Sequence, residues 1–224
     1  MTTCSEIIAK LRTLANPANV IGMARYGINS SDALGVSMPA LRLLARQYRR
    51  QHALALELWQ SGIHEARIMA ALVDDPKLVT AAQMESWVRD FASWDVCDQV
   101  CSNLFDKTPF AQEKILAWTG RREEFVKRAG FVLMAALAVH DKKAPDETFV
   151  NFLPLLEREA HDERNFVRKA INWALRQIGK RNARLKPAAL ATARRILAQD
   201  TPPARWIARD AIRELEAHRT KDLL

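Results

Sequence analysis

Glycine is scarce in this chain, with 7 residues among 224. Loops that cradle phosphates, or that place a catalytic serine on a sharp turn, need glycines at fixed spacing. The sequence contains no G-x-x-x-x-G-K-[ST], G-x-G-x-x-G or G-x-S-x-G motif. These absences argue against a nucleotide-binding loop and against a serine hydrolase of the nucleophile-elbow type.

Cysteine is equally rare, since Cys4, Cys97 and Cys101 are an odd number with no disulfide framework. Cys97 and Cys101 are four residues apart and could share a metal ion on a helix. Two thiolates do not complete a site, however, and the five histidines show no ligand spacing. We interpret the pair as small apolar residues of a helix core and predict no metal site. A reducing, cytoplasmic location is the simplest inference.

Long hydrophobic runs are also missing. No run approaches the roughly 20 residues that span a bilayer, and residues 1–15 lack the apolar core of a secretory signal. We therefore predict no membrane partner. Alanine, the best helix former, is abundant, and most of the chain follows a period near 3.6 residues without strand-like alternation. The sequence predicts an all-α protein with helices over roughly 4–15, 18–26, 38–50, 52–61, 64–73, 80–92, 94–105, 110–118, 122–140, 146–159, 164–180, 187–199 and 203–217.

The second half of the chain repeats. Residues 125–129 (FVKRA), 166–170 (FVRKA) and 207–211 (IARDA) resemble one another at successive offsets of 41 residues. A period near 40 with two helices per unit is typical of HEAT or armadillo repeats, which stack into a solenoid. We predict one HEAT-like helical-repeat domain over residues 1–224. Equivalent basic positions would then line one concave surface, among them Arg128, Arg168, Lys169 and Arg209.

Positive charge is concentrated in one segment. Thirteen Lys or Arg and two Asp lie between Arg164 and Arg213, a net charge of +11 in a chain whose total is +8. Such an uneven distribution of charge indicates what kind of partner the protein binds and says little about its fold. A phosphate backbone is the usual partner of a basic face, and an anionic membrane surface or an acidic protein is the alternative. A charged helix face can also be only solvated.

Residues 93–99 (SWDVCDQ) contain the strongest candidate for chemistry. Ser93 suits a helix N-cap, and Trp94 and Asp98 are four residues apart, so they share a helix face. An aromatic and a carboxylate on one face can form a site, or they can be a core residue and a solvated acid. The same two interpretations apply to Trp173 within the basic segment and to Tyr26, one of two tyrosines.

Four separated segments together resemble the HEAT-repeat DNA alkylation repair proteins of the AlkD type. They are residues 23–26 (MARY) with 34–36 (LGV), residues 93–98 (SWDVCD), residues 125–129 (FVKRA) and residues 169–176 (KAINWALR). Their order and spacing span most of the chain, from about residue 20 to residue 180.

This resemblance implies a solenoid whose concave basic face cups duplex DNA. It also implies a DNA glycosylase that hydrolyses the N-glycosidic bond of cationic alkylated purines such as 3-methyladenine and 7-methylguanine. By position, Asp98 matches the catalytic aspartate, and Trp94 and Trp173 match two tryptophans that line the cleft. Arg128 matches a DNA-contacting arginine, and Tyr26 matches a tyrosine near the same site. Ser93 departs from the pattern, because a known member of that family has a second tryptophan at the corresponding position.

The remaining expectations concern partners. We expect Arg168, Lys169, Arg176 and Lys180 to bind phosphates of double-stranded DNA containing alkylated bases. We expect no cofactor, a monomer, and a bacterial-type cytosol and nucleoid as the place of action. Two other function classes stay open at this point, a non-catalytic DNA-binding solenoid of the same family and a protein-binding helical scaffold. A DNA affinity that falls steeply with added salt would distinguish a DNA-binding solenoid from a protein-binding scaffold.

Overall fold

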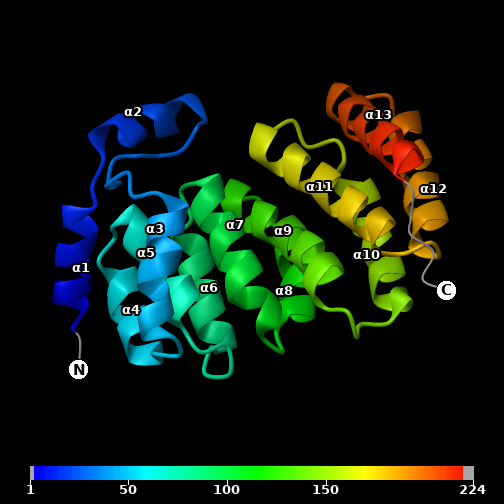
Figure 1. Ribbon diagram of the computed structural model, residues 1–224. Coiled ribbons are helices and arrows are strands. Elements are labelled where there is room, and N and C mark those ends of the chain that lie inside the picture. Colours follow the sequence, from blue (N-terminus) through cyan, green and yellow to red (C-terminus); the bar gives the residue numbers. More distant parts are fainter. Residues whose placement is uncertain (1–2, 219–224) are drawn as a thin grey trace. The chain divides into compact units, whose positions relative to one another are not determined.

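The structure is a computed structural model that describes residues 3–218 (Figure 1). Within that range the chain is all-helical, as predicted, and forms no β-strand. None of its helices is long and apolar enough to cross a membrane. The helices are α1 (Cys4–Thr13), α2 (Pro17–Arg25), α3 (Met38–Ala45), η1 (Arg46–Tyr48), α4 (His52–Gln60), α5 (His64–Val73), α6 (Ala81–Arg89), α7 (Trp94–Asn103), η2 (Phe105–Lys107), α8 (Ala111–Trp118), α9 (Glu124–His140), α10 (Asp146–Glu159), α11 (Asn165–Arg181), α12 (Leu185–Ala198) and α13 (Pro202–Ala217).

Every helix predicted from the sequence is found, and the helices over 64–73 and 146–159 match at both ends. The largest difference is at 38–50, where the α-helix ends at Ala45 and a short 3₁₀ helix follows. The chain then turns sharply, because Arg49 is extended and Arg50 has a φ of +60°, in the left-handed region. An uninterrupted helical pattern in the sequence does not reveal such a turn.

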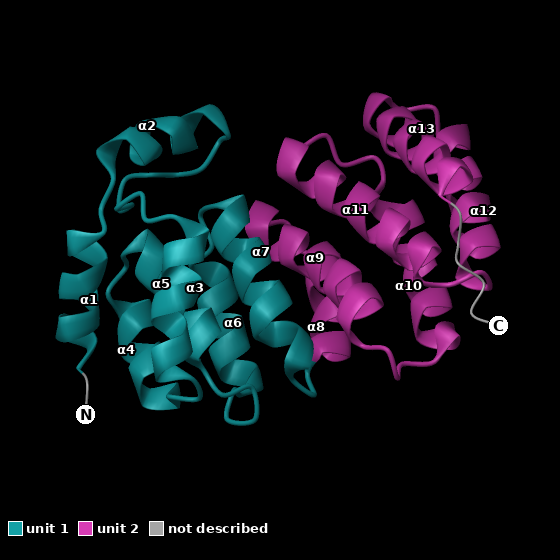
Figure 2. Cartoon of the chain, viewed as in Figure 1, with its two compact units in different colours: residues 1–110 teal, residues 111–224 magenta. Residues whose placement is uncertain are grey.

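The chain divides into two compact units, residues 1–110 and residues 111–224 (Figure 2). The expectation of one domain over residues 1–224, with a concave basic face along it, stays a prediction.

Unit 1 is built on α5, which packs against α3, α4 and α7. Its core contains an aromatic stack in which the rings of Trp59 and Trp87 are parallel, with centroids 4.1 Å apart. Phe91 and Phe105 extend this cluster. The indole Nε1 of Trp59 donates to the Asp90 carboxylate at 2.8 Å, so the buried ring also satisfies its polar atom.

Unit 2 confirms the packing expected of the 41-residue repeat. Helix α11 packs between α9 and α13, and the rings of the equivalent residues Phe125 and Phe166 are in contact, tilted by 30° with centroids 5.7 Å apart. Helices α11 and α13 approach closely at Gly179. A Cβ at this position would lie 2.7 Å from the Leu215 side chain. Helix α9 is buried along most of its length, from Val126 to Ala138.

A buried charge cluster fixes the turn before α11 in unit 2. The Lys127 ammonium lies 2.6 Å from the Glu159 carboxylate and 2.9 Å from the Asp162 carboxylate, and Arg164 pairs with Asp162 at 2.6 Å. Burial raises the pKa of both carboxyl groups, but hydrogen bonds from the cations outweigh it, so each pKa lies below its ordinary value. The cluster therefore holds both acids in the charged form.

Candidate functional site

The amino end of α7 is tied to α5 through Asp95. Ser93 occupies the N-cap position, as predicted, but its hydroxyl donates to the Asp95 carboxylate rather than capping the helix. The other Asp95 oxygen lies 2.8 Å from Nε2 of His64, the first residue of α5. Burial raises the pKa of Asp95, and the contacts with His64 and Ser93 lower it by more, so the net shift is downward. Asp95 is thus a fixed, ionised link between the two helices.

Trp94 is held from the other side by α2. Its indole Nε1 donates at 3.0 Å to the backbone carbonyl of Tyr26, the C-cap residue that follows α2. The Tyr26 side chain is 74% exposed. The structure therefore brings together two predicted site residues that are 68 positions apart in the sequence. The bond uses the backbone of Tyr26, which leaves its phenol to solvent.

Asp98 stands one turn after Trp94 in α7 and is partly buried. Beneath it, Cys97 and Cys101 are fully buried, as predicted. Burial raises the pKa of the Cys101 thiol well above its ordinary value, with smaller contributions from Cys97 and from the charge of Asp98. Both thiols are core residues without reactive character. Among residues 3–218, no group of three His, Cys, Asp or Glu is placed to hold a metal ion.

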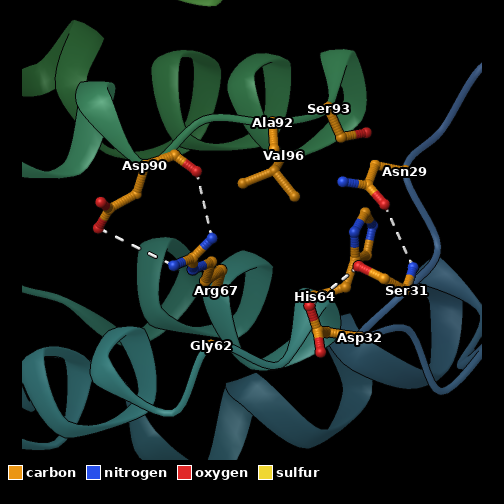
Figure 3. Close-up of a pocket in the computed structure, with 10 residues that line it drawn as sticks. All are labelled: Asn29, Ser31, Asp32, Gly62, His64, Arg67, Asp90, Ala92, Ser93 and Val96. Atoms are coloured by element: carbon orange, nitrogen blue, oxygen red, sulfur yellow. Dashed lines mark hydrogen bonds and ion pairs between the residues drawn. The ribbon is translucent and has the colours of Figure 1, made fainter.

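Two hollows meet at His64. The smaller measures about 40 Å³ and lies among Asn29, Arg67, Asp90 and Ser93, with Arg67 held by Asp90 (Figure 3). The larger, about 370 Å³, is a groove among α2, α3 and α5 that reaches Tyr26 and Asp95. The small pocket suits an ordered water at most.

The loop between α2 and α3 forms the wall of the groove and is shaped by one buried acid. The Glu65 carboxylate, 1% exposed, accepts the backbone N–H groups of Leu34, Gly35 and Val36 at 2.8, 2.6 and 3.2 Å. Gly35 has a φ of +75°, and a Cβ there would meet the Asn16 carbonyl. The segment of residues 34–36 (LGV) is therefore shaped by its hydrogen bonds to Glu65 and by the left-handed backbone of Gly35.

The predicted site residues of unit 2 lie on α9 and α11 and differ in exposure. Arg128 is 5% exposed and donates at 2.5 Å to the carbonyl of Phe166, which links α9 to the first turn of α11. Trp173 is partly buried in α11. Arg168 covers the Trp206 ring at 5.1 Å, and Lys169 is exposed. The grouping of these residues with Asp98 stays a prediction from the resemblance.

Arg176 and Lys180 are engaged within unit 2. Both pair with the Glu214 carboxylate, Lys180 at 2.6 Å. Burial raises the pKa of Glu214, and the two cations lower it further than burial raises it. Their role as phosphate contacts stays a prediction, but each side chain already has an anionic partner.

Ion pairs are common across the whole basic segment. Eight of its cations lie within 4 Å of a carboxylate: Arg164, Arg176, Lys180, Arg184, Arg194, Arg195, Arg205 and Arg213. Several of the acids, such as Asp146, Glu157 and Glu214, lie outside residues 164–213. Counting charge along the sequence therefore overstates how much of it is available to a partner.

Stacked helical hairpins with a 41-residue repeat define a HEAT-like helical-repeat protein. The model of the family described as DNA alkylation repair enzyme matches residues 7–215, so the chain belongs to that family. This confirms the resemblance seen in the four sequence segments.

A solved structure has the same fold. It is described as a new family of proteins related to the HEAT-like repeat DNA glycosylases with affinity for branched DNA structures. The TM-score is 0.79 at 17% sequence identity, over 98% of this chain and 98% of that one. No curated protein matches the chain.

Proposed function

We propose that the protein is a monofunctional DNA glycosylase that excises cationic N3- or N7-alkylated purines from duplex DNA, acting as a monomer in the cytosol. The observation that carries the proposal is the Trp94–Asp98 face of α7. An indole and a carboxylate lie there on successive turns. The Tyr26 carbonyl holds the indole, and the contact of Asp95 with His64 anchors the first turn of α7. Membership of the DNA alkylation repair family supports the same substrate class.

The chemistry follows from the charge of the lesion. Alkylation at N3 or N7 makes the purine cationic, so it leaves with the electron pair of the C1′–N bond without prior protonation. The deoxyribose develops positive charge at C1′ as that bond breaks. The Asp98 carboxylate would stabilise this charge electrostatically, and it would orient the water that adds to C1′ and then loses a proton.

The tryptophans would assist through their ring faces. The π face of an indole carries partial negative charge and attracts a nearby cation. Trp94 would lie beside the developing sugar cation, and the family resemblance assigns the same role to Trp173. The reaction needs no redox step, and the family resemblance assigns DNA contacts to Arg128 and Tyr26.

The decisive experiment measures base release from duplexes that contain 3-methyladenine or 7-methylguanine. Asp98→Asn keeps the size of the side chain and removes its charge. We expect release by the wild-type protein to fall by at least about 100-fold, the scale of one lost electrostatic stabiliser, with DNA affinity retained. Glu113→Gln, at an exposed acid of α8, is the matched control and should release base normally.

A non-catalytic DNA-binding protein is the second candidate. It is favoured by Ser93, which stands where the AlkD-type pattern has a tryptophan, and by the structural neighbour described through its affinity for branched DNA. Salt-sensitive binding to duplex or branched DNA, with no base release from either methylated purine, would identify this function and reject the glycosylase.

A further inference from the structure

Unit 1 carries a group of arginines that the sequence analysis did not single out. Arg42, Arg46, Arg49 and Arg50 are all exposed. Their guanidinium groups form no ion pair or hydrogen bond within residues 3–218, and residues 33–56 contain no acid. We call these four residues, with Lys107, the arginine surface.

The arginine surface contrasts with the basic segment of unit 2. There, seven of the ten arginines pair with a carboxylate, as Arg195 does with Glu157 and Arg176 with Glu214. A guanidinium that already has an anionic partner gains little from a second one. The four arginines of the arginine surface keep their full capacity for an external anion.

Backbone contacts hold these arginines close together. Arg42 and Arg46 are one turn apart, and Arg49 follows three residues later, so the side chains start on neighbouring positions. Between them, Tyr48 is 6% exposed and accepts a hydrogen bond at 2.8 Å from Lys10. After the left-handed turn at Arg50, the Gln51 N–H donates to the Val73 carbonyl at 2.8 Å. The backbone that presents the arginines is therefore preorganised.

Two adjoining grooves run beneath the side chains. One, of about 200 Å³, is lined by Arg42, Arg46 and Arg49, and the next, of about 310 Å³, by Arg49, Arg50 and Lys107. Leu72 and Asn103 line both, so the grooves form one continuous hollow. The acid that borders it, Asp74, is occupied, because it accepts from His52 at 2.7 Å and from Gln83 at 2.8 Å.

The arginine surface lies at the carboxyl ends of the helices whose amino ends carry the candidate site. His64 opens α5 and Leu72 is near its end, eight residues later. Trp94 opens α7 and Asn103 closes it. At 1.5 Å per residue the separation along each helix is about 12–14 Å, or about four base pairs of duplex DNA.

We infer that the arginine surface binds consecutive phosphates of a DNA backbone beside the candidate site and supplies affinity that does not depend on the lesion. Forked guanidinium groups match phosphate oxygens, and these four guanidinium groups have no carboxylate partner within residues 3–218 to compete with a phosphate. The inference rests on the proposed function only in taking DNA as the ligand, because base release is not required for it.

The test is the salt dependence of binding to an undamaged linear duplex, in a variant with Arg42, Arg46, Arg49 and Arg50 changed to glutamine. Each lost phosphate contact reduces the slope of log K against log salt by about 0.9, so four reduce it by up to about 3.6. The matched control changes four ion-paired arginines to glutamine, Arg194, Arg195, Arg205 and Arg213, with the same loss of formal charge. Thermal unfolding verifies that both variants are folded.

A slope that falls by two or more in the first variant and by less than one in the control supports the inference. An unchanged slope in the first variant overturns it, and so does an equal fall in both, which would reflect net charge alone. Base release from methylated duplex at saturating protein is read separately. A wild-type protein that binds with a steep slope but releases no base would reject the glycosylase and leave the arginine surface standing.

Discussion

The indole of Trp94 donates its hydrogen to the backbone carbonyl of Tyr26 at 3.0 Å, which joins the first residue of α7 to the last turn of α2. A backbone carbonyl is an acceptor that no substitution of Tyr26 removes. The orientation of the Trp94 ring is therefore set by the path of the chain at residue 26 rather than by the tyrosine side chain.

Replacing Trp94 with phenylalanine tests this relationship. Trp94→Phe keeps an aromatic face and loses the N–H donor, so the Tyr26 carbonyl loses its partner at a cost of about 1 kcal/mol. We expect the midpoint of urea unfolding to fall accordingly and base release to drop several-fold. Tyr26→Phe keeps the carbonyl and should unfold like the wild-type protein. Equal unfolding of Trp94→Phe and wild type would show that the bond does not hold the ring.

The link between Asp95 and His64 predicts a specific acid lability. The pKa of Asp95 is lower in the folded protein than its ordinary value of about 3.9. Its ionisation therefore stabilises the fold above about pH 4, and this contribution is lost as pH falls through the folded-state pKa. Asp95→Asn removes the titrating group. The free energy of unfolding should change less between about pH 6 and pH 3 in that variant than in the wild-type protein. Identical pH dependence would contradict the assignment.

The buried cluster around Lys127 predicts a large stability effect in unit 2. Lys127→Met leaves Glu159 and Asp162 without their shared cation, and breaking a buried pair costs about 3–5 kcal/mol. Because Arg164 still pairs with Asp162, we expect the lower end of that range. Urea unfolding measures the change, and Lys142→Met, at an exposed lysine, should alter stability by less than about 0.5 kcal/mol.

Replacing Gly130 with alanine should overpack the contact between the end of α8 and α9. A Cβ at Gly130 would lie 2.9 Å from the backbone nitrogen of Thr119, an atom that cannot move aside as a side chain can. Gly130→Ala should destabilise by about 1–3 kcal/mol, although alanine is the better helix former by about 1 kcal/mol. Gly22→Ala is the control, since a Cβ there meets nothing within 4 Å and should stabilise α2. Calorimetric midpoints that move in the same direction for both variants would contradict this account.

The helices could be predicted closely because amphipathic period and proline breaks act locally. The repeat of residues 125–129 at 166–170 also appears in the structure, where the rings of Phe125 and Phe166 are in contact. The position of Trp94 and Asp98 on one face of α7 follows from helical spacing alone. These features depend on residues close together in the sequence or on a repeat visible in it.

The pairing of charges could not be predicted in the same way. Arg176 and Lys180 meet Glu214 only because α11 packs on α13, and their partner lies beyond the basic segment. His64 reaches Asp95 across 31 residues, with no motif linking them. The arginine surface does not stand out in the sequence, because its five cations are few beside the thirteen of residues 164–213. What distinguishes the four arginines is that no carboxylate in the described part of the chain pairs with them, which becomes clear only when the helices are packed.

Helix α2 has no buried residue, and Ile21 on it is 68% exposed. Its neighbours hold it mainly by polar contacts, the Trp94 bond at its end and the Asn19 amide bond to the Gly35 carbonyl at 2.8 Å. Gly35 in turn rests on the Glu65 carboxylate. Because α2 buries no apolar side chain, we expect its local opening to cost less free energy than opening of the rest of unit 1. Its amide hydrogens should exchange with solvent through a local opening that leaves the aromatic core of unit 1 closed.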